Sequence, residues 1–167
     1  MLHSPSNIKH IVKNIKLEYE DCSLEDIIKA RNINLIYLDD FEAKGAYGKF
    51  DFKFENGFVI SRQFIFINSN LNYHEIKAIL AHELGHALLH PDINTIDEKY
   101  KPIIPDGKIE RQADIFASEF LLDDDSTIEY VNSSISNIDQ ARYQYVPVKY
   151  VDLKCENLSK FKFTSSL

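Results

Sequence analysis

Helical spacing of apolar residues opens the chain and predicts two helices. The first covers residues 6–19, with apolar positions three and four apart at Ile8, Ile11, Val12, Ile15 and Tyr19. The second begins at residue 23, where Ser23 and Asp26 form the pattern of a capping box.

The pattern then alternates between apolar and polar positions, which predicts strands. Residues 35–38 form one strand, and phenylalanines alternate with charged residues over residues 49–54 in a second. Asn56-Gly57 follows, and this dipeptide is typical of a tight hairpin because both central residues of a type I′ turn need positive φ. Residues 58–60 and 64–67 are expected to supply the returning strand and a further strand.

Helical spacing returns over residues 72–90, and Pro91 ends that helix. Residues 91–106 contain three prolines and are expected to form a loop. Further helices are predicted over 107–122, 126–133, 135–144 and 147–158. The order of helices, a small antiparallel or mixed sheet and more helices predicts an α+β fold. We expect one domain over residues 1–167, with a core at 64–122 and a helical extension at 123–167.

Composition narrows the class of protein. The chain has 167 residues, of which 44% are hydrophobic and 27% charged, as in an ordinary soluble domain. The net charge of −7 argues against general attraction to nucleic acid or anionic lipid. No apolar run reaches the roughly 20 residues of a membrane span, and the first residues lack the pattern of a signal peptide. We therefore expect a cytoplasmic protein whose two cysteines, Cys22 and Cys155, are reduced.

Residues 82–86 read His-Glu-Leu-Gly-His within the helix predicted over 72–90. His82 and His86 are four residues apart, so both project from one helix face and can bind one tetrahedral zinc ion. Glu83 would lie beside the metal and can take a proton from a bound water. A chance match on a surface helix is the alternative. The apolar remainder of this helix argues against it, because unpaired His and Glu are costly to bury.

Zinc needs a third protein ligand. His90 lies on the same face, but eight residues of helix place it about 12 Å from His82. We expect His90 to end the helix, where a cation is favourable. Glu110 and Asp114 are four residues apart in the next long helix, so one carboxylate can bind zinc while the other accepts a ligand histidine's N–H. The alternative for Glu110 is a solvated carboxylate in the first helical turn.

Two segments resemble the ImmA/IrrE family of metallo-endopeptidases. They are Leu-Ala-His-Glu-Leu-Gly-His-Ala-Leu-Leu-His at 80–90 and Glu-Arg-Gln-Ala-Asp-Ile-Phe-Ala-Ser-Glu-Phe-Leu-Leu at 110–122. The resemblance implies a zincin-like fold in which the zinc ligands are His82, His86 and Glu110. It also implies that Glu83 is the catalytic base and that Asp114 orients His82. One departure is Asp123-Asp-Asp125, where the family often has a proline.

The resemblance further implies a biological role. Members encoded on phages and integrating elements act on a helix-turn-helix repressor and relieve transcriptional repression, and others act on a similar repressor in stress responses. We therefore expect a zinc-dependent endopeptidase with such a repressor as substrate. One alternative is a non-catalytic zinc-binding regulator that binds a repressor, although a structural site needs no base like Glu83. A zinc hydrolase acting on another substrate class is the third.

The remaining predictions concern the substrate. An extended peptide can add to the edge of a sheet, and the strand expected to offer that edge comprises Phe64, Ile65, Phe66, Ile67 and Asn68. A second electrophile is expected for the oxyanion, with Tyr100, His90 and Tyr143 as candidates. Residues 138–158 can look like a helix-turn-helix, but their few basic residues favour helices that cover the core over direct nucleic-acid binding.

Overall fold

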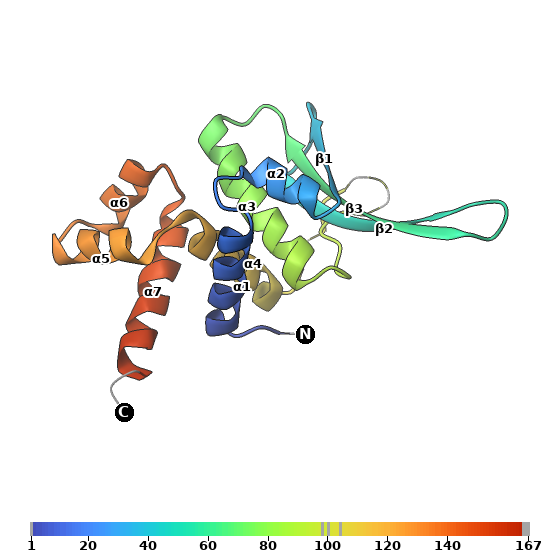
Figure 1. Ribbon diagram of the computed structural model, residues 1–167. Coiled ribbons are helices and arrows are strands. Elements are labelled where there is room, and N and C mark those ends of the chain that lie inside the picture. The colour runs from blue at the N-terminus through green and yellow to red at the C-terminus, as the bar shows by residue number, and fades with distance from the viewer. Residues whose placement is uncertain (1, 98, 100, 104, 165–167) are drawn as a thin grey trace.

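The chain folds as two helices, three strands and a second group of helices (Figure 1). The computed structural model describes residues 2–97, 99, 101–103 and 105–164. Within these ranges the helices and strands are α1 (Pro5–Glu18), α2 (Leu24–Ala30), β1 (Ile33–Leu38), β2 (Gly45–Lys53), β3 (Val59–Asn68), α3 (Tyr73–Leu89), α4 (Gly107–Leu121), α5 (Asp124–Asn132), α6 (Asn137–Gln144) and α7 (Val148–Thr164). This order confirms the predicted α+β class.

The helices begin where their capping residues indicate. Ser4 accepts a hydrogen bond from the backbone N–H of Asn7 at the start of α1. Ser23 and Asp26 form the predicted capping box of α2, and Asn72 forms another with Glu75 at α3. These bonds satisfy backbone N–H groups that have no partner in the first helical turn.

The sheet is mixed, with strand order β1-β3-β2. β3 pairs parallel to β1 and antiparallel to β2. The two strands predicted at 58–60 and 64–67 are one continuous strand, because β2 pairs with β3 from Val59 to Ile67 without a break. Gly57 has a φ of 81° in the intervening turn, and the β2–β3 hairpin extends away from the helices (Figure 1).

The prediction that residues 64–68 form a substrate-binding edge was wrong. Phe64, Ile65, Phe66, Ile67 and Asn68 lie in β3, which is the central strand. Its backbone groups pair with β1 on one side and with β2 on the other, so they are not free to bind an added peptide strand. β2 lies between β1 and β3 in the sequence, but β3 lies between β1 and β2 in the sheet, so sequence order did not give strand order.

α3 and α4 pack face to face, and a glycine allows their close approach. A Cβ atom on Gly85 would lie 3.1 Å from Cβ of Phe116 and 3.2 Å from the backbone of Ala113. α3 is buried along most of its length, including the fully enclosed Ala81 and Leu84. This packing explains a glycine inside a helix, where it is otherwise unfavourable by about 1 kcal/mol against alanine.

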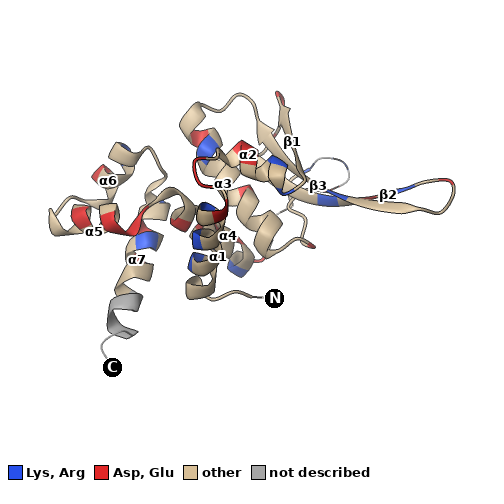
Figure 2. Ribbon diagram, in the orientation of Figure 1, with Lys and Arg blue, Asp and Glu red and all other residues tan. Residues whose placement is uncertain are grey.

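A buried ionic cluster holds the C-terminal helices. Nζ of Lys154 on α7 lies 2.6 Å from Glu119 on α4 and 2.5 Å from Asp124 on α5, and the Lys154 side chain is almost fully buried. Lys9 of α1 also pairs with Asp124. The acidic residues of α5 stand out in Figure 2. The departure from the family pattern at 123–125 therefore supplies a carboxylate that ties α5 to two other helices.

Two further expectations concern the cysteines and membranes. Cys22 and Cys155 are both free thiols, as predicted. Across the residues that the structure describes, no helix has both the length and the apolar character required to span a bilayer.

Candidate metal centre

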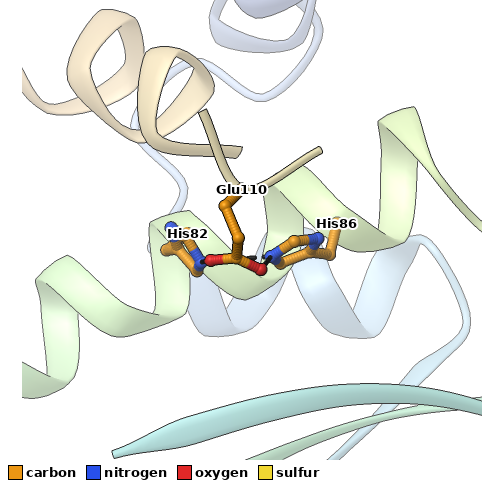
Figure 3. Close-up of side chains that lie close together, drawn as sticks. All are labelled: His82, His86 and Glu110. Carbon is orange, nitrogen blue, oxygen red and sulfur yellow. Dashed lines mark hydrogen bonds and ion pairs between the residues drawn. The ribbon is translucent and has the colours of Figure 1, made fainter. Parts of the chain in front are cut away.

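His82, His86 and Glu110 converge on one point between α3 and α4 (Figure 3). Nε2 of His82 lies 3.1 Å from Nε2 of His86. The carboxylate of Glu110 reaches across from α4 to lie 3.4 Å from His82 Nε2 and 3.2 Å from His86 Nε2. One helical turn therefore places the two imidazoles together, and the second helix supplies the carboxylate.

These separations fit a tetrahedral metal ion. Two ligand atoms that each lie 2.0–2.1 Å from a tetrahedral zinc are about 3.3–3.4 Å apart. The three observed separations run from 3.1 to 3.4 Å. Two nitrogens and one carboxylate oxygen are also the donor types that zinc binds in proteins. The cluster can thus hold a metal ion with little movement of its side chains.

Asp114 supports the first histidine from behind. Its Oδ1 accepts a hydrogen bond from Nδ1 of His82 at 2.9 Å, and Nζ of Lys149 on α7 donates to the same oxygen at 2.7 Å. This bond leaves Nε2 of His82 facing Glu110. Burial lowers the pKa of His82, but the bonds from Asp114 and Glu110 outweigh burial and raise it to about 9. The hydrogen bond with His82 is also the main cause that lowers the pKa of Glu110.

Glu83 lies beside the cluster without joining it. The residue is 4% exposed, and its Oε2 has no hydrogen-bond partner among the described residues. A Cβ atom on Gly45 of β2 would overlap Cγ2 of Ile79 and lie 3.1 Å from Oε1 of Glu83, so the glycine lets the strand pass close to α3. Burial raises the pKa of Glu83. A carboxylate with a raised pKa and an unused oxygen is equipped to accept a proton.

The cluster opens into a cavity of about 430 Å³. Two of the residues that line it, Lys149 and Tyr150, come from the first turn of α7 and were not among the sequence predictions. Burial raises the pKa of Tyr150, and so do the negative charges of Asp114, Glu83 and Glu110. These charges favour the neutral, protonated form of the Tyr150 hydroxyl. Nothing in the spacing of residues 149–150 relates them to the metal helix, so the sequence contained no signal for them.

The other sequence candidates lie elsewhere. His90 ends α3 as predicted, but burial, and then neighbouring His86, lower its pKa to about 4. This lowered pKa disfavours the helix-terminal cation that was expected at His90. His90 and Tyr143 are both absent from the described lining of the metal cavity. Tyr143 is exposed on α6 and stacks on Tyr130. Tyr100 lies outside the described residues.

The edge of β2 nearest the cavity is partly covered by the chain itself. Thr95 bonds to both the N–H and the carbonyl of Tyr47, and the Asn94 side chain does the same at Lys49. Strand positions alternate, so the backbone N–H and carbonyl of Gly45 point away from β3, as those of Tyr47 and Lys49 do. Gly45 also lines the metal cavity.

The α+β fold and the His-His-Glu cluster are consistent with a zincin-like fold of the metallopeptidase class. The chain belongs to the ImmA/IrrE family, since residues 28–156 match the family model described as the IrrE N-terminal-like domain. It is 34% identical to Uncharacterized immunity region protein 2 of Bacillus phage phi105 over 93% of this chain and 92% of that protein. It is also 26% identical to Metallopeptidase ImmA of Bacillus subtilis, over 96% of this chain and 90% of that protein.

Proposed function

We propose that this protein is a zinc-dependent endopeptidase that cleaves a helix-turn-helix transcriptional repressor. The observation that carries the proposal is the geometry around Glu83. Three metal-binding atoms lie 3.1–3.4 Å apart, and a buried carboxylate with a free oxygen adjoins them. A purely structural zinc site has four protein ligands and no such neighbour.

The residues that would hold zinc are His82, His86 and Glu110. Three protein ligands and an open side facing a cavity are typical of catalytic zinc sites. When bound, zinc lowers the pKa of water and polarises a carbonyl group. Asp114 and Lys149 keep the His82 imidazole in the orientation that this binding needs.

The remaining chemistry falls to Glu83 and Tyr150. Glu83 takes a proton from the attacking water at its unpaired oxygen and passes it to the leaving amine, a role that its raised pKa favours. Tyr150 lines the same cavity and offers its O–H to the developing oxyanion. It takes the place of Tyr100, His90 and Tyr143 as the proposed donor. Gly45 is partly exposed on the edge strand β2 and lines the metal cavity, so its backbone offers the nearest sheet edge for an extended substrate.

The proposed substrate class rests on relatives as well as on chemistry. One relative is named as an immunity region protein of a phage and another as a metallopeptidase. The first name fits a role on a mobile element, and the family resemblance implies that the protein that is cut is a repressor of such an element or of a stress response. Cleavage would relieve repression, and it would take place in the cytoplasm, where such repressors bind DNA. The net charge of −7 favours a protein substrate over direct binding to nucleic acid.

The test is cleavage of a candidate repressor by the purified chain with zinc. The parent should yield a discrete product, and Glu83→Gln should yield none while retaining zinc by metal analysis. Glu55→Gln is the matched control, because Glu55 is exposed in the hairpin. Equal cleavage by Glu83→Gln and the parent would refute the proposed base. Stable binding of the repressor without any product would instead indicate the non-catalytic regulator.

A further inference from the structure

A second hollow, of about 670 Å³, lies next to the metal cavity. We call it the α3–α6 groove. One wall is the first two turns of α3, including His74, Glu75 and Ala78. The other wall is formed by Ile138 of α6, by Tyr145, which caps the end of α6, and by Val148 at the start of α7. Pro147 lines both hollows, so the groove and the metal cavity adjoin at the start of α7.

The groove presents apolar side chains to solvent. Ile138 is 56% exposed, Tyr145 is 64% exposed and Val148 is 42% exposed. Tyr145 also has a φ of 54°, a left-handed conformation that is uncommon for a bulky side chain. Its ring stacks on His74 with centroids 4.3 Å apart. The aromatic ring is thus held in place across the groove by the neighbouring helix.

The register of α3 sets the distance from the groove to the metal cluster. Ala78 precedes His82 by four residues and Glu75 precedes it by seven. At 1.5 Å per residue these positions lie about 6–10 Å along the helix from the first metal-binding side chain. An extended peptide advances about 3.3 Å per residue. A substrate bound over the metal cluster would therefore bring a side chain two to three residues from its scissile bond to the groove.

We propose that the α3–α6 groove binds an aliphatic or aromatic side chain of the substrate, two to three residues from the scissile bond. This inference rests on the proposed peptidase function and adds a source of sequence selectivity. The occupant is the substrate itself, because Pro147 joins the groove to the cavity in which the peptide bond would be cut. Burial of one apolar side chain of this size corresponds to about tenfold or more in binding.

The test is a cleavage profile on a peptide library made by digesting a bacterial proteome. Products of the zinc-loaded parent should show apolar residues enriched at one position two to three residues from the cut. Ile138→Asp and Val148→Asp should each reduce that enrichment about tenfold. Ile138 is the second residue of α6 and Val148 is the first residue of α7, and an aspartate is tolerated in the first turn of a helix. Val131→Asp, on α5 and 53% exposed, is the control that should leave the profile unchanged.

A binding measurement makes the result independent of turnover. The best-cleaved peptide, labelled with fluorescein, should bind zinc-loaded Glu83→Gln and lose about tenfold in affinity when Ile138→Asp is added. If an aspartate variant fails to fold by circular dichroism, Val148→Thr, which keeps the shape of valine, carries the same test with a smaller expected loss.

The other outcomes separate the two proposals. Zinc-dependent cleavage with no apolar preference at that distance would overturn the proposed role of the groove. A preference that is unchanged in both aspartate variants would do the same. Both outcomes would leave the proposed peptidase function intact. A parent dimer in sedimentation that Ile138→Asp disrupts and Val131→Asp does not would show that a second copy covers the groove, which also overturns the proposal. No zinc-dependent cleavage of any peptide would overturn both.

Discussion

Asp114 and His82 are joined by a hydrogen bond of 2.9 Å between Oδ1 and Nδ1, across the interface of α3 and α4. The same oxygen accepts a bond from Lys149 of α7 at 2.7 Å. One carboxylate therefore links three helices and sets which nitrogen of His82 faces the metal cluster. The precision of the proposed metal site depends on packing between elements that are far apart in the sequence.

Replacing Asp114 tests this support. Asp114→Ala should weaken zinc binding about 10- to 100-fold, because His82 loses the acceptor that orients its ring. The affinity can be measured by titration against a chelator that competes for zinc. Asp125→Ala, at an exposed position of α5, should have no effect. An unchanged affinity in Asp114→Ala would show that the bond does not orient a metal ligand.

Tyr150→Phe tests the proposed oxyanion donor. Removal of one such donor lowers kcat by about 10²–10³ in well-studied hydrolases, and a loss in that range is expected here with zinc content unchanged. KM should change little, because the bond forms only as charge develops on the substrate oxygen. Tyr143→Phe is the matched control, since Tyr143 is exposed away from the cavity. A kcat of Tyr150→Phe equal to that of the parent would show that Tyr150 is not the oxyanion donor.

Gly85→Ala tests the close packing of α3 against α4. The added Cβ would lie 3.1 Å from Phe116, so α4 must shift. We expect a free energy of unfolding lower by about 1–3 kcal/mol, together with weaker zinc binding because α4 carries Glu110. Gly107→Ala has open space around its Cβ and should be neutral or slightly stabilising. Chemical denaturation of both variants decides the point, and equal stability would argue against tight packing.

Lys154→Met tests the ionic cluster beneath α5. The change leaves Glu119 and Asp124 without their shared cation, and Glu119 is buried. Loss of one partner from a buried ion pair costs about 3–5 kcal/mol, and we expect a loss in free energy of unfolding near the lower limit because Asp124 is partly exposed. Lys53→Met, in the exposed hairpin, is the control. A loss below about 1 kcal/mol would show that the cluster contributes little.

The same cluster predicts a dependence of stability on pH. Burial raises the pKa of Asp124, but bonds from Lys154 and Lys9 outweigh burial and hold it below its usual range. A carboxylate with a lowered folded-state pKa contributes stability above its unfolded-state pKa of about 4. That contribution is lost as the pH falls through the lower folded-state value. Asp124→Asn should therefore be less stable than the parent at pH 7, and the difference should shrink towards pH 3 in denaturant titrations.

Features that depend on neighbouring residues were predictable from the sequence. The spacing of His82 and His86 places both on one helix face by geometry alone, and the structure confirms their proximity. The spacing of Glu110 and Asp114 likewise anticipated two carboxylates on one face, and both contact His82. The caps at Ser23 and Asn72 were predictable because a capping side chain bonds to backbone only two or three residues away.

Strand order was beyond local pattern. Alternation indicates that residues 64–67 are extended, but it does not say which strands lie on either side. β1 pairs in parallel with β3, although β2 lies between them in the sequence, and this pairing makes β3 the central strand. The prediction that residues 64–68 offer a substrate-binding edge was wrong for that reason.

By itself, then, the sequence determined the metal-binding pattern, the helices that carry it and the family to which the chain belongs. Only the tertiary structure brought Lys149 and Tyr150 to the cavity, because their approach depends on how α7 packs against α4. It also decided which carboxylate faces both histidines and which faces the back of one. The spacing of residues along a helix sets the direction in which their side chains project from its axis. Contact between segments that are distant in the sequence depends on the packing of the whole core.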